Sequence, residues 1–362
     1  MGVAPSPAVR PDRPAPGAPR RLLLIQTYFL GDVLLTTPAI RAARRLFPDA
    51  RIDFLTGAAG AGALEGNPHL DEVVRLDPRA GGQWGLLREI RRRRYDAVVD
   101  FLSNPRTALI TAASGAAVRI GIRGRGPRNV AYTHLAPRET GPVYVGLQKL
   151  RLLRYLGLEI GDDPDLRLEI AFGEEERRWA AEVWARSGLR PDAPVIAISP
   201  VSRERFKQWG GERWAVVADR LADAGFQVLI TSGPGEREQA AAVTERMRHT
   251  AVWDYGPTTV RQLAALYERC ALWIGNDGGP KHIAAAAGLS TVSVIRWRLG
   301  PIWTDERIVP SQVAIERAPP QGCDRRCARC THLGCLAAVP PDAVVDAALE
   351  VLARPGRAPT HA

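Results

Sequence analysis

The 362-residue chain lacks a segment that could cross a bilayer as a helix, since no uninterrupted apolar run of about 18 residues occurs. Its first twenty residues, rich in Pro, Ala and Arg, lack the apolar centre of a signal peptide. We therefore expect residues 1–20 to form a disordered tail and the protein to be cytoplasmic. Only five cysteines occur, four of them close together near the C-terminus, which excludes a disulfide framework along the whole chain. No long internal repeat is visible.

The overall composition is typical of a soluble globular protein, with 46% hydrophobic residues and a mean hydropathy of −0.14. The length favours two domains of ordinary size. A formal net charge of +10 and a pI near 9.9 favour an anionic partner, such as a nucleotide, phospholipid head groups or nucleic acid. A general preference for Arg over Lys is the alternative explanation of this charge.

The first half of the chain alternates apolar strands with helices. The continuous apolar run 22–25 predicts a parallel strand buried on both faces, and a helix over 33–47 follows. Asp32 stands where strand meets helix, at the edge of the sheet where open α/β sheets bind ligands, although a helix N-cap is the alternative role. The remaining strands are predicted over 51–55, 73–76, 97–101 and 118–121, which implies a parallel sheet. The run Arg91–Arg94 is typical of a solvated helix end, and an anionic membrane is the alternative partner.

The second half repeats this alternation after Gly161–Pro164, with strands predicted over 194–199 and 227–231. Two doubly wound domains that face each other enclose a cleft. Lys207 follows the first of these strands, where its ammonium can reach a diphosphate, unless it is an ordinary surface lysine. Glu236 follows a Gly-Pro-Gly turn and can accept hydrogen bonds from ribose hydroxyls. Its alternative role is that of a favourable acid in a first helical turn.

The stretch Gly275–His282 links a strand over 271–274 to a helix of small residues, and another strand follows at 291–295. Its glycines allow a ligand to approach the backbone, and the helix start offers N–H groups to a phosphate. Asp277 can accept from sugar hydroxyls, while Lys281 and His282 can donate to phosphate oxygens. A tight turn with an Asp cap is the alternative interpretation.

Four segments together resemble one family. Gln26–Pro38 is similar to the N-terminal signature of glycosyltransferase family 9, which contains the ADP-heptose:lipopolysaccharide heptosyltransferases. Lys207–Trp214, Ser232–Glu236 and Gly275–His282 resemble the other motifs of that family, so the resemblance covers about residues 21–352. It implies an α/β GT-B fold, in which two Rossmann-like doubly wound domains face a central cleft. The implied divisions are an acceptor domain, a nucleotide-sugar domain and a C-terminal helix that packs across the domain junction: 21–172, 173–338 and 339–354.

The resemblance also implies an inverting, metal-independent transfer without a cofactor, in the first place of heptose from ADP-heptose to a lipopolysaccharide-core glycolipid. The acceptor would lie at the inner face of the cytoplasmic membrane, with peripheral contact between the enzyme and anionic lipid. Asp32 would be the general base, and Lys207 would assist catalysis by holding the donor phosphates. Glu236 would hold the ribose or sugar. The diphosphate-sugar site would be lined by Asp277, Gly278, Gly279 and His282.

Two rival functions remain at this stage. One is the same fold with another nucleotide sugar, serving a different surface polysaccharide. The other is a non-catalytic basic protein that binds nucleotides or nucleic acid. Asp32 argues against the second and against a nucleic-acid partner, because a phosphate binder gains nothing from a carboxylate facing its ligand. Gly278 stands where the family usually has Ser or Thr, and Lys281 stands where an apolar residue is usual, so the donor stays open.

The C-terminal cysteines form a cluster of their own: Cys323, Cys327, Cys330 and Cys335, with His332 among them. Their spacing is compatible with a structural zinc site, and reduced buried thiols are the alternative. No metal is expected at the catalytic site, because no Asp-x-Asp pair lies in a suitable loop.

Overall fold

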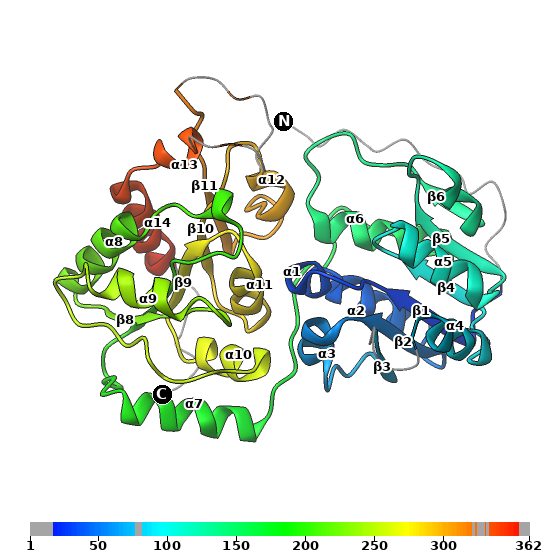
Figure 1. Cartoon of the computed structure of the whole chain (residues 1–362), viewed down its shortest axis with the longest axis horizontal. Coiled ribbons are helices and arrows are strands. Elements are labelled where there is room, and N and C mark those ends of the chain that lie inside the picture. Colours follow the sequence, from blue (N-terminus) through cyan, green and yellow to red (C-terminus); the bar gives the residue numbers. More distant parts are fainter. Residues whose placement is uncertain (1–16, 77–81, 321–322, 324–329, 331–332, 355–362) are drawn as a thin grey trace.

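The computed structural model describes residues 17–76, 82–320, 323, 330 and 333–354. Most of the predicted tail lies outside these residues, as do Cys327 and His332 of the cysteine cluster. The described chain forms two parallel sheets side by side (Figure 1). The first has strand order β3-β2-β1-β4-β5-β6 and the second β11-β10-β9-β7-β8.

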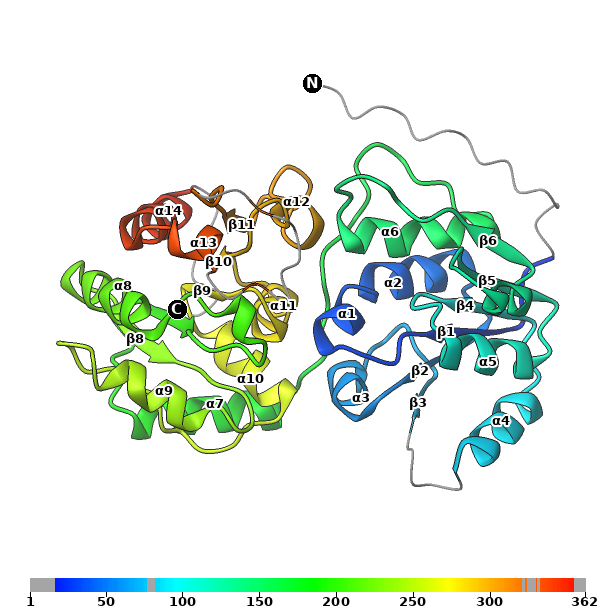
Figure 2. The same ribbon diagram turned by 45° about the horizontal axis from the view of Figure 1, so that its top comes forward.

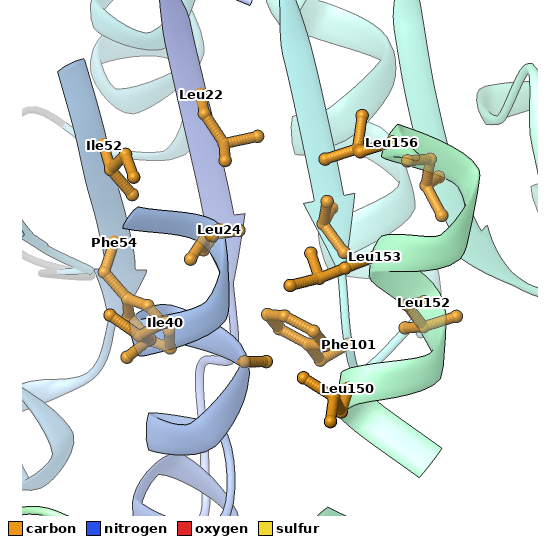
Figure 3. Close-up of a cluster of buried hydrophobic side chains, with 14 of the residues drawn as sticks. Leu22, Leu24, Ile40, Ile52, Phe54, Phe101, Leu150, Leu152, Leu153 and Leu156 are labelled. Carbon is orange, nitrogen blue, oxygen red and sulfur yellow. The ribbon is translucent and has the colours of Figure 1, made fainter. Parts of the chain in front are cut away.

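Strand β1 lies at the centre of the first sheet and is buried on both faces, as its apolar run predicts. Leu22 and Leu24 face one core, together with Phe54 and Phe101 (Figure 3). Leu23 and its alternate neighbour Ile25 face the other core. The strands of this sheet are β1 Arg21–Ile25, β2 Arg51–Thr56, β3 Glu72–Arg75, β4 Ala97–Asp100, β5 Val118–Ile122 and β6 His134–Ala136.

Helices cover both faces of the first sheet, as a doubly wound domain requires. The face with Leu22 is covered by α2 Thr37–Leu46, α6 Val145–Leu152 and η2 Leu153–Leu156. The opposite face is covered by α4 Gly82–Arg92 and α5 Pro105–Ser114. The remaining helical segments are α1 Leu30–Leu34, α3 Ala58–Leu64 and η1 Pro127–Ala131.

The helix predicted over 33–47 is two helices, α1 and α2, and α1 begins before Asp32. The break has a local cause. The hydroxyls of Thr36 and Thr37 donate to the carbonyls of Val33 and Leu34, at 2.5 and 2.7 Å. Pro38 has no N–H with which to continue the helical bonds of α1. Three polar or imino residues in a row therefore end α1 and begin α2.

The second sheet contains β7 Val195–Ser199, β8 Gln227–Ile230, β9 Leu272–Asn276, β10 Thr291–Val294 and β11 Gln312–Ile315. Its helices are α7 Glu174–Arg186, η3 Arg205–Lys207, α8 Gly211–Asp223, α9 Arg237–Thr244, α10 Val260–Glu268, α11 Gly279–Ala286, α12 Gly300–Trp303, α13 Gly334–Ala337 and α14 Pro341–Ala353. The sequence did not predict the edge strands β6 and β11, since each is short and has half-buried residues. Within the described residues, no helix is both long and apolar enough to cross a membrane.

Helix α14 packs on the second sheet rather than across the domain junction as expected. Its buried residues Val344, Ala348 and Val351 belong to the same apolar core as α8 and strands β9 to β11. Because this apolar stripe completes the core of its own domain, little remains to bury against the first sheet. Figure 1 shows α14 beside α8, on the side of the second sheet away from the first.

The two sheets meet through α1 and α11, which lie against each other between them (Figure 2). Leu34 and Ala63 of the first half share an apolar cluster with Ile283 and Ala284 of α11. Helix α1 follows β1 and α11 follows β9, so the carboxyl ends of both central strands point to this junction. That is the edge at which open α/β sheets bind ligands.

Candidate active site

Asp32 lies in α1, at the junction, with its side chain 24% exposed. The N-cap of α1 is Phe29 rather than Asp32, which stands in the first turn and accepts from the Phe29 backbone amide. Burial raises the pKa of Asp32 above its ordinary value, while the Lys149 ammonium and the Phe29 backbone amide act in the opposite direction. The result is a carboxylate that binds a proton more readily than a fully exposed one and whose side chain is still partly exposed.

Lys149 of α6 is the neighbour of Asp32 that the sequence interpretation missed. Its Nζ lies 3.9 Å from Asp32 Oδ1 and donates to Gln26 Oε1 at 2.7 Å. Burial lowers the pKa of Lys149 to about 8, although Asp32 and Asp100 favour its charged form. A signal was present, because Lys149 precedes Leu152 and Leu153 by three and four residues and therefore lies on the apolar face of its helix.

Asp277 follows β9, on the second domain's side of the junction, and forms ion pairs with two lysines. Its Oδ2 lies 3.0 Å from Lys207 Nζ, and its Oδ1 lies 2.6 Å from Lys281 Nζ. Burial opposes the charge of Asp277, but the ammonium groups of Lys281 and Lys207 outweigh burial and hold its pKa well below the ordinary value. Each carboxylate oxygen thus holds one lysine ammonium, and Asp277 orients Lys207.

The two lysines differ in their access to a ligand. Lys207 is one-quarter exposed, whereas Lys281 is fully buried and also donates to Thr304 Oγ1 at 2.6 Å. Lys281 therefore ties α11 to the end of α12, and the expectation that it donates to a phosphate is wrong. Lys207 is the more accessible of the two cations, and its charge lowers the pKa of Asp32 as well as that of Asp277.

His282 of α11 packs directly against α1. A Cβ added to Gly31 would lie 2.6 Å from His282 Cδ2, so only glycine permits this approach. Burial, followed by the charge of Lys281, lowers the pKa of His282 well below its ordinary value. Its Nδ1 is buried and has no hydrogen-bond partner within the described part of the chain. A neutral ring keeps one N–H donor for a ligand.

The remaining predicted residues lie on the same domain. Gly278 is extended, with φ −176°, and a Cβ there would meet nothing closer than 3.7 Å. A serine or threonine would therefore fit, and packing does not explain the glycine. Gly279 begins α11. Glu236 is the N-cap of α9, and its Oε2 accepts from the Gly233 amide at 2.7 Å, which closes the turn after β8.

Two further residues hold the loop that carries Lys207. The side chain of Asn276 accepts from the Trp209 amide at 3.0 Å and donates to the Pro200 carbonyl at 2.6 Å, so both ends of the loop are fixed to β9. The guanidinium of Arg203 lies 4.7 Å from the ring centroid of Phe29, across the junction. The structure thus brings together Asp32, Lys207, Asp277 and His282, and adds Lys149 and Asn276.

Metal ligation finds no support in the part of the chain that is described, which contains no group of three His, Cys, Asp or Glu placed to hold an ion. The zinc prediction for the cysteine cluster involves Cys327 and His332, which lie outside the described residues.

Comparisons of the sequence and of the structure with known proteins indicate the same family. The sequence profile of glycosyltransferase family 9 (heptosyltransferase) matches residues 83–296. Lipopolysaccharide heptosyltransferase 3 of Escherichia coli (strain K12) is 28% identical over 299 residues, which are 77% of this chain and 84% of that protein.

Two solved structures share the whole fold. The glycosyl transferase family 9 protein of Veillonella parvula has a TM-score of 0.78 and 24% identity, covering 92% of this chain and 97% of its own. ADP-heptose lipopolysaccharide heptosyltransferase II of E. coli has a TM-score of 0.70 and 20% identity, covering 92% and 98%. The GT-B fold predicted from the resemblance is confirmed.

Proposed function

Because the chain belongs to glycosyltransferase family 9, we propose that it transfers heptose from ADP-heptose to a glycolipid acceptor of the lipopolysaccharide-core type. The transfer inverts the anomeric centre and needs no metal ion. The relatives named above supply the donor and acceptor classes. The observation that carries the proposal is the arrangement of Asp32 opposite the Lys207–Asp277 pair, at the point where the two domains meet.

In this proposal Asp32 is the general base. The acceptor hydroxyl loses its proton to Asp32 while its oxygen attacks the anomeric carbon, and the bond from that carbon to the diphosphate breaks. A carboxylate with a raised pKa suits this role, provided that it is ionised before the reaction. Lys149 serves that requirement, since its charge lies 3.9 Å from Asp32 and favours the ionised form.

Lys207 and α11 stabilise the departing diphosphate. The leaving group gains negative charge as the bond breaks, and Lys207 is held toward the junction by Asp277 at 3.0 Å. The free N–H groups at the start of α11, beginning at Gly279, form the anion site expected at a helix N-terminus. His282 donates one hydrogen bond from its neutral ring. These groups are fixed before the reaction and so stabilise its transition state without reorganisation.

A second nucleotide sugar is the alternative donor, and the space at Gly278 favours it. Where the family usually places a hydroxyl, this chain leaves room next to the start of α11. A donor with a bulkier or differently oriented hydroxyl would fit there, and the acceptor would then belong to another surface polysaccharide. A non-catalytic role is disfavoured by Asp32, because a carboxylate facing a phosphate ligand lowers its affinity. The acceptor site would lie in the cytoplasm at the inner face of the membrane.

The proposal is tested by incubating the purified protein with ADP-heptose and a heptose-accepting core glycolipid, in excess chelator. We expect release of ADP, an acceptor heavier by one heptose, and inverted anomeric configuration by NMR. Uridine and guanosine diphosphate sugars serve as comparison donors. The Lys207→Ala variant should bind ADP about 10- to 100-fold more weakly, as for a lost hydrogen bond to a charged group. Turnover with another donor alone, or only after metal is restored, would contradict the proposal.

A further inference from the structure

One face of the first domain exposes apolar side chains on three adjacent helical segments. Trp84 of α4 is 76% exposed, Leu109 of α5 is 45% exposed and Val130 of η1 is 84% exposed. Helices α4 and α5 contact each other, and so do α5 and η1. Large apolar side chains are normally scattered singly over a surface, so three on neighbouring elements call for an explanation.

These side chains share one face because of how the helices pack. A Cβ added to Gly115, which ends α5, would lie 1.3 Å from Arg91 Nη1, so Arg91 of α4 reaches over the end of α5. Trp84 and Arg88 precede Arg91 by seven and three residues and therefore lie on the same stripe of α4. On α5 the exposed stripe contains Leu109. Segment η1 packs on α5 through Ala108, Ala131 and Tyr132, which leaves Val130 outward beside it.

The same region carries an excess of positive charge. Residues 82–131 contain ten arginines and three acidic residues, against a net charge of +10 for all 362 residues. The run Arg91–Arg94 is not uniformly solvated, because Arg93 turns inward to Asp53 and Glu72. Arg88 and Arg91 stay exposed next to Trp84.

We propose that this face docks on an anionic lipid bilayer, with Trp84, Leu109 and Val130 entering the head-group region and Arg88 and Arg91 binding lipid phosphates. These five residues are the docking surface. Exposed arginines beside a few separate apolar side chains are a pattern of interfacial membrane binding, and tryptophan favours the depth of the lipid head groups. A stable protein interface would need a larger contiguous apolar centre with fewer charges.

The docking surface ends beside the acceptor side of the site. Asn104, the N-cap of α5, donates to the Tyr28 hydroxyl at 2.7 Å, and Tyr28 precedes Asp32 by four residues. A glycolipid held in the docked bilayer would therefore present its sugar along α5 toward Asp32. This delivery step rests on the proposed function, whereas the lipid binding itself does not.

The test is co-sedimentation with vesicles of phosphatidylglycerol and phosphatidylcholine, compared with phosphatidylcholine alone. The full chain should bind the anionic vesicles and release with rising salt. The variants Leu109→Asp with Val130→Asp, and Arg88→Glu with Arg91→Glu, should each bind at least about tenfold more weakly. Matched controls on the other domain are Val216→Asp, at a side chain 40% exposed on α8, and Arg246→Glu, and they should bind as the unaltered protein does. Unchanged ADP binding and melting temperature show that each variant is folded.

The docking proposal would be overturned by no binding of the unaltered protein to anionic vesicles, by unweakened binding of the docking variants, or by equal loss of binding in the controls. A dimer that the docking variants convert to monomer would assign the surface to a second copy and would overturn it as well. Turnover separates the two proposals. With a deacylated, water-soluble acceptor the docking variants should keep normal turnover, and with acceptor embedded in vesicles they should lose most of it. Absence of turnover on every acceptor, with lipid binding intact, would count against the proposed function alone.

Discussion

At the scale of single residues, the environment of Asp32 combines two opposed effects. Burial at the junction favours its protonated form, and the buried Lys149 favours its ionised form. Lys149 is itself poised, because burial lowers its pKa to about 8. The proposed general base must be desolvated enough to accept a proton and yet ionised before the reaction, and burial and the Lys149 charge act on Asp32 in these two directions.

Replacing Asp32 by Asn should remove the base while keeping the shape of the site. Turnover is expected to fall by ~10²–10⁴-fold, the usual contribution of a general base, with little change in ADP affinity. The Asp32 carboxylate accepts from the backbone amide of Phe29, the N-cap of α1, so Asp32→Asn, which keeps an acceptor, should retain its stability, whereas Asp32→Ala should lose up to ~1 kcal/mol. Turnover, calorimetric ADP titration and melting of both variants check this, and near-normal turnover in Asp32→Asn would rule out the proposed base.

The pKa of Lys149 predicts how stability depends on pH. In the folded protein the pKa is about 8 and in the unfolded chain it returns toward 10.5, so the unfolded chain binds more protons in between. The free energy of unfolding should therefore rise with pH from about 8 to 10.5, relative to the Lys149→Met variant, by roughly 2–4 kcal/mol.

The measurement is urea denaturation of both proteins at several pH values from 7 to 11. The unaltered protein should gain stability over the variant as pH rises, because its buried ammonium loses its charge. Parallel curves for the two proteins would mean that burial does not lower the pKa of Lys149.

At the scale of elements, the contact between α1 and α11 determines how close the two halves of the site come. Gly31 in α1 faces the edge of the His282 ring, and Gly279 begins α11 next to Leu30. Each helix follows the central strand of its sheet, so this contact places Asp32 and Lys207 on opposite sides of one junction.

Gly31→Ala should therefore destabilise the protein, since the new methyl group would lie 2.6 Å from a buried ring that cannot move freely. The expected cost is ~1–3 kcal/mol, as for overpacking of a core, with a loss of turnover. Gly62→Ala in α3 is the matched control, because nothing lies within 4 Å of the added carbon and alanine favours a helix. Combining Gly31→Ala with His282→Ala should recover part of the lost stability, and strictly additive costs would show that the two residues do not collide.

Several helices and strands were correctly predicted from the sequence, and each wrong prediction has a physical cause. The apolar run of β1 predicts a buried strand, and the small residues of α11 predict a helix, as the structure shows. The break between α1 and α2 depends on hydroxyls that bond to carbonyls three residues away, which helical periodicity does not reveal. The position of α14 depends on which core its apolar stripe completes, and that is a tertiary property.

The site residues that stand within one sequence motif were predictable. The contacts between residues of two different elements were not. Lys207, Asp277 and His282 stand in recognisable segments, but the contact of Lys281 with Thr304 requires that α11 folds against the end of α12. Lys149 comes within 3.9 Å of Asp32 only because α6 covers the same sheet as β1. Local sequence patterns therefore identify candidate residues, and tertiary packing determines which of them contact each other.

At the scale of the whole molecule, the two domains share apolar cores. Leu34 and Ala63 of the first domain are buried in one cluster with Ile283 and Ala284 of the second. Trp303, beyond the second sheet's β10, packs against the main core of the first domain. Neither domain could open fully without exposing apolar surface of the other, so we expect the molecule to unfold as one cooperative unit.

Calorimetry should accordingly show a single thermal transition, with van't Hoff and calorimetric enthalpies equal. ADP is proposed to bind the second domain only, and at about 100 times its Kd it should add ~2.7 kcal/mol to the stability of what it binds. If the domains are coupled, the whole transition shifts upward and amide exchange slows in β1 and β4 as well as in β9. If they are independent, ADP splits the transition and leaves exchange in β1 unchanged. The Leu34→Ala variant should loosen this coupling, because it removes a fully buried side chain from the shared cluster.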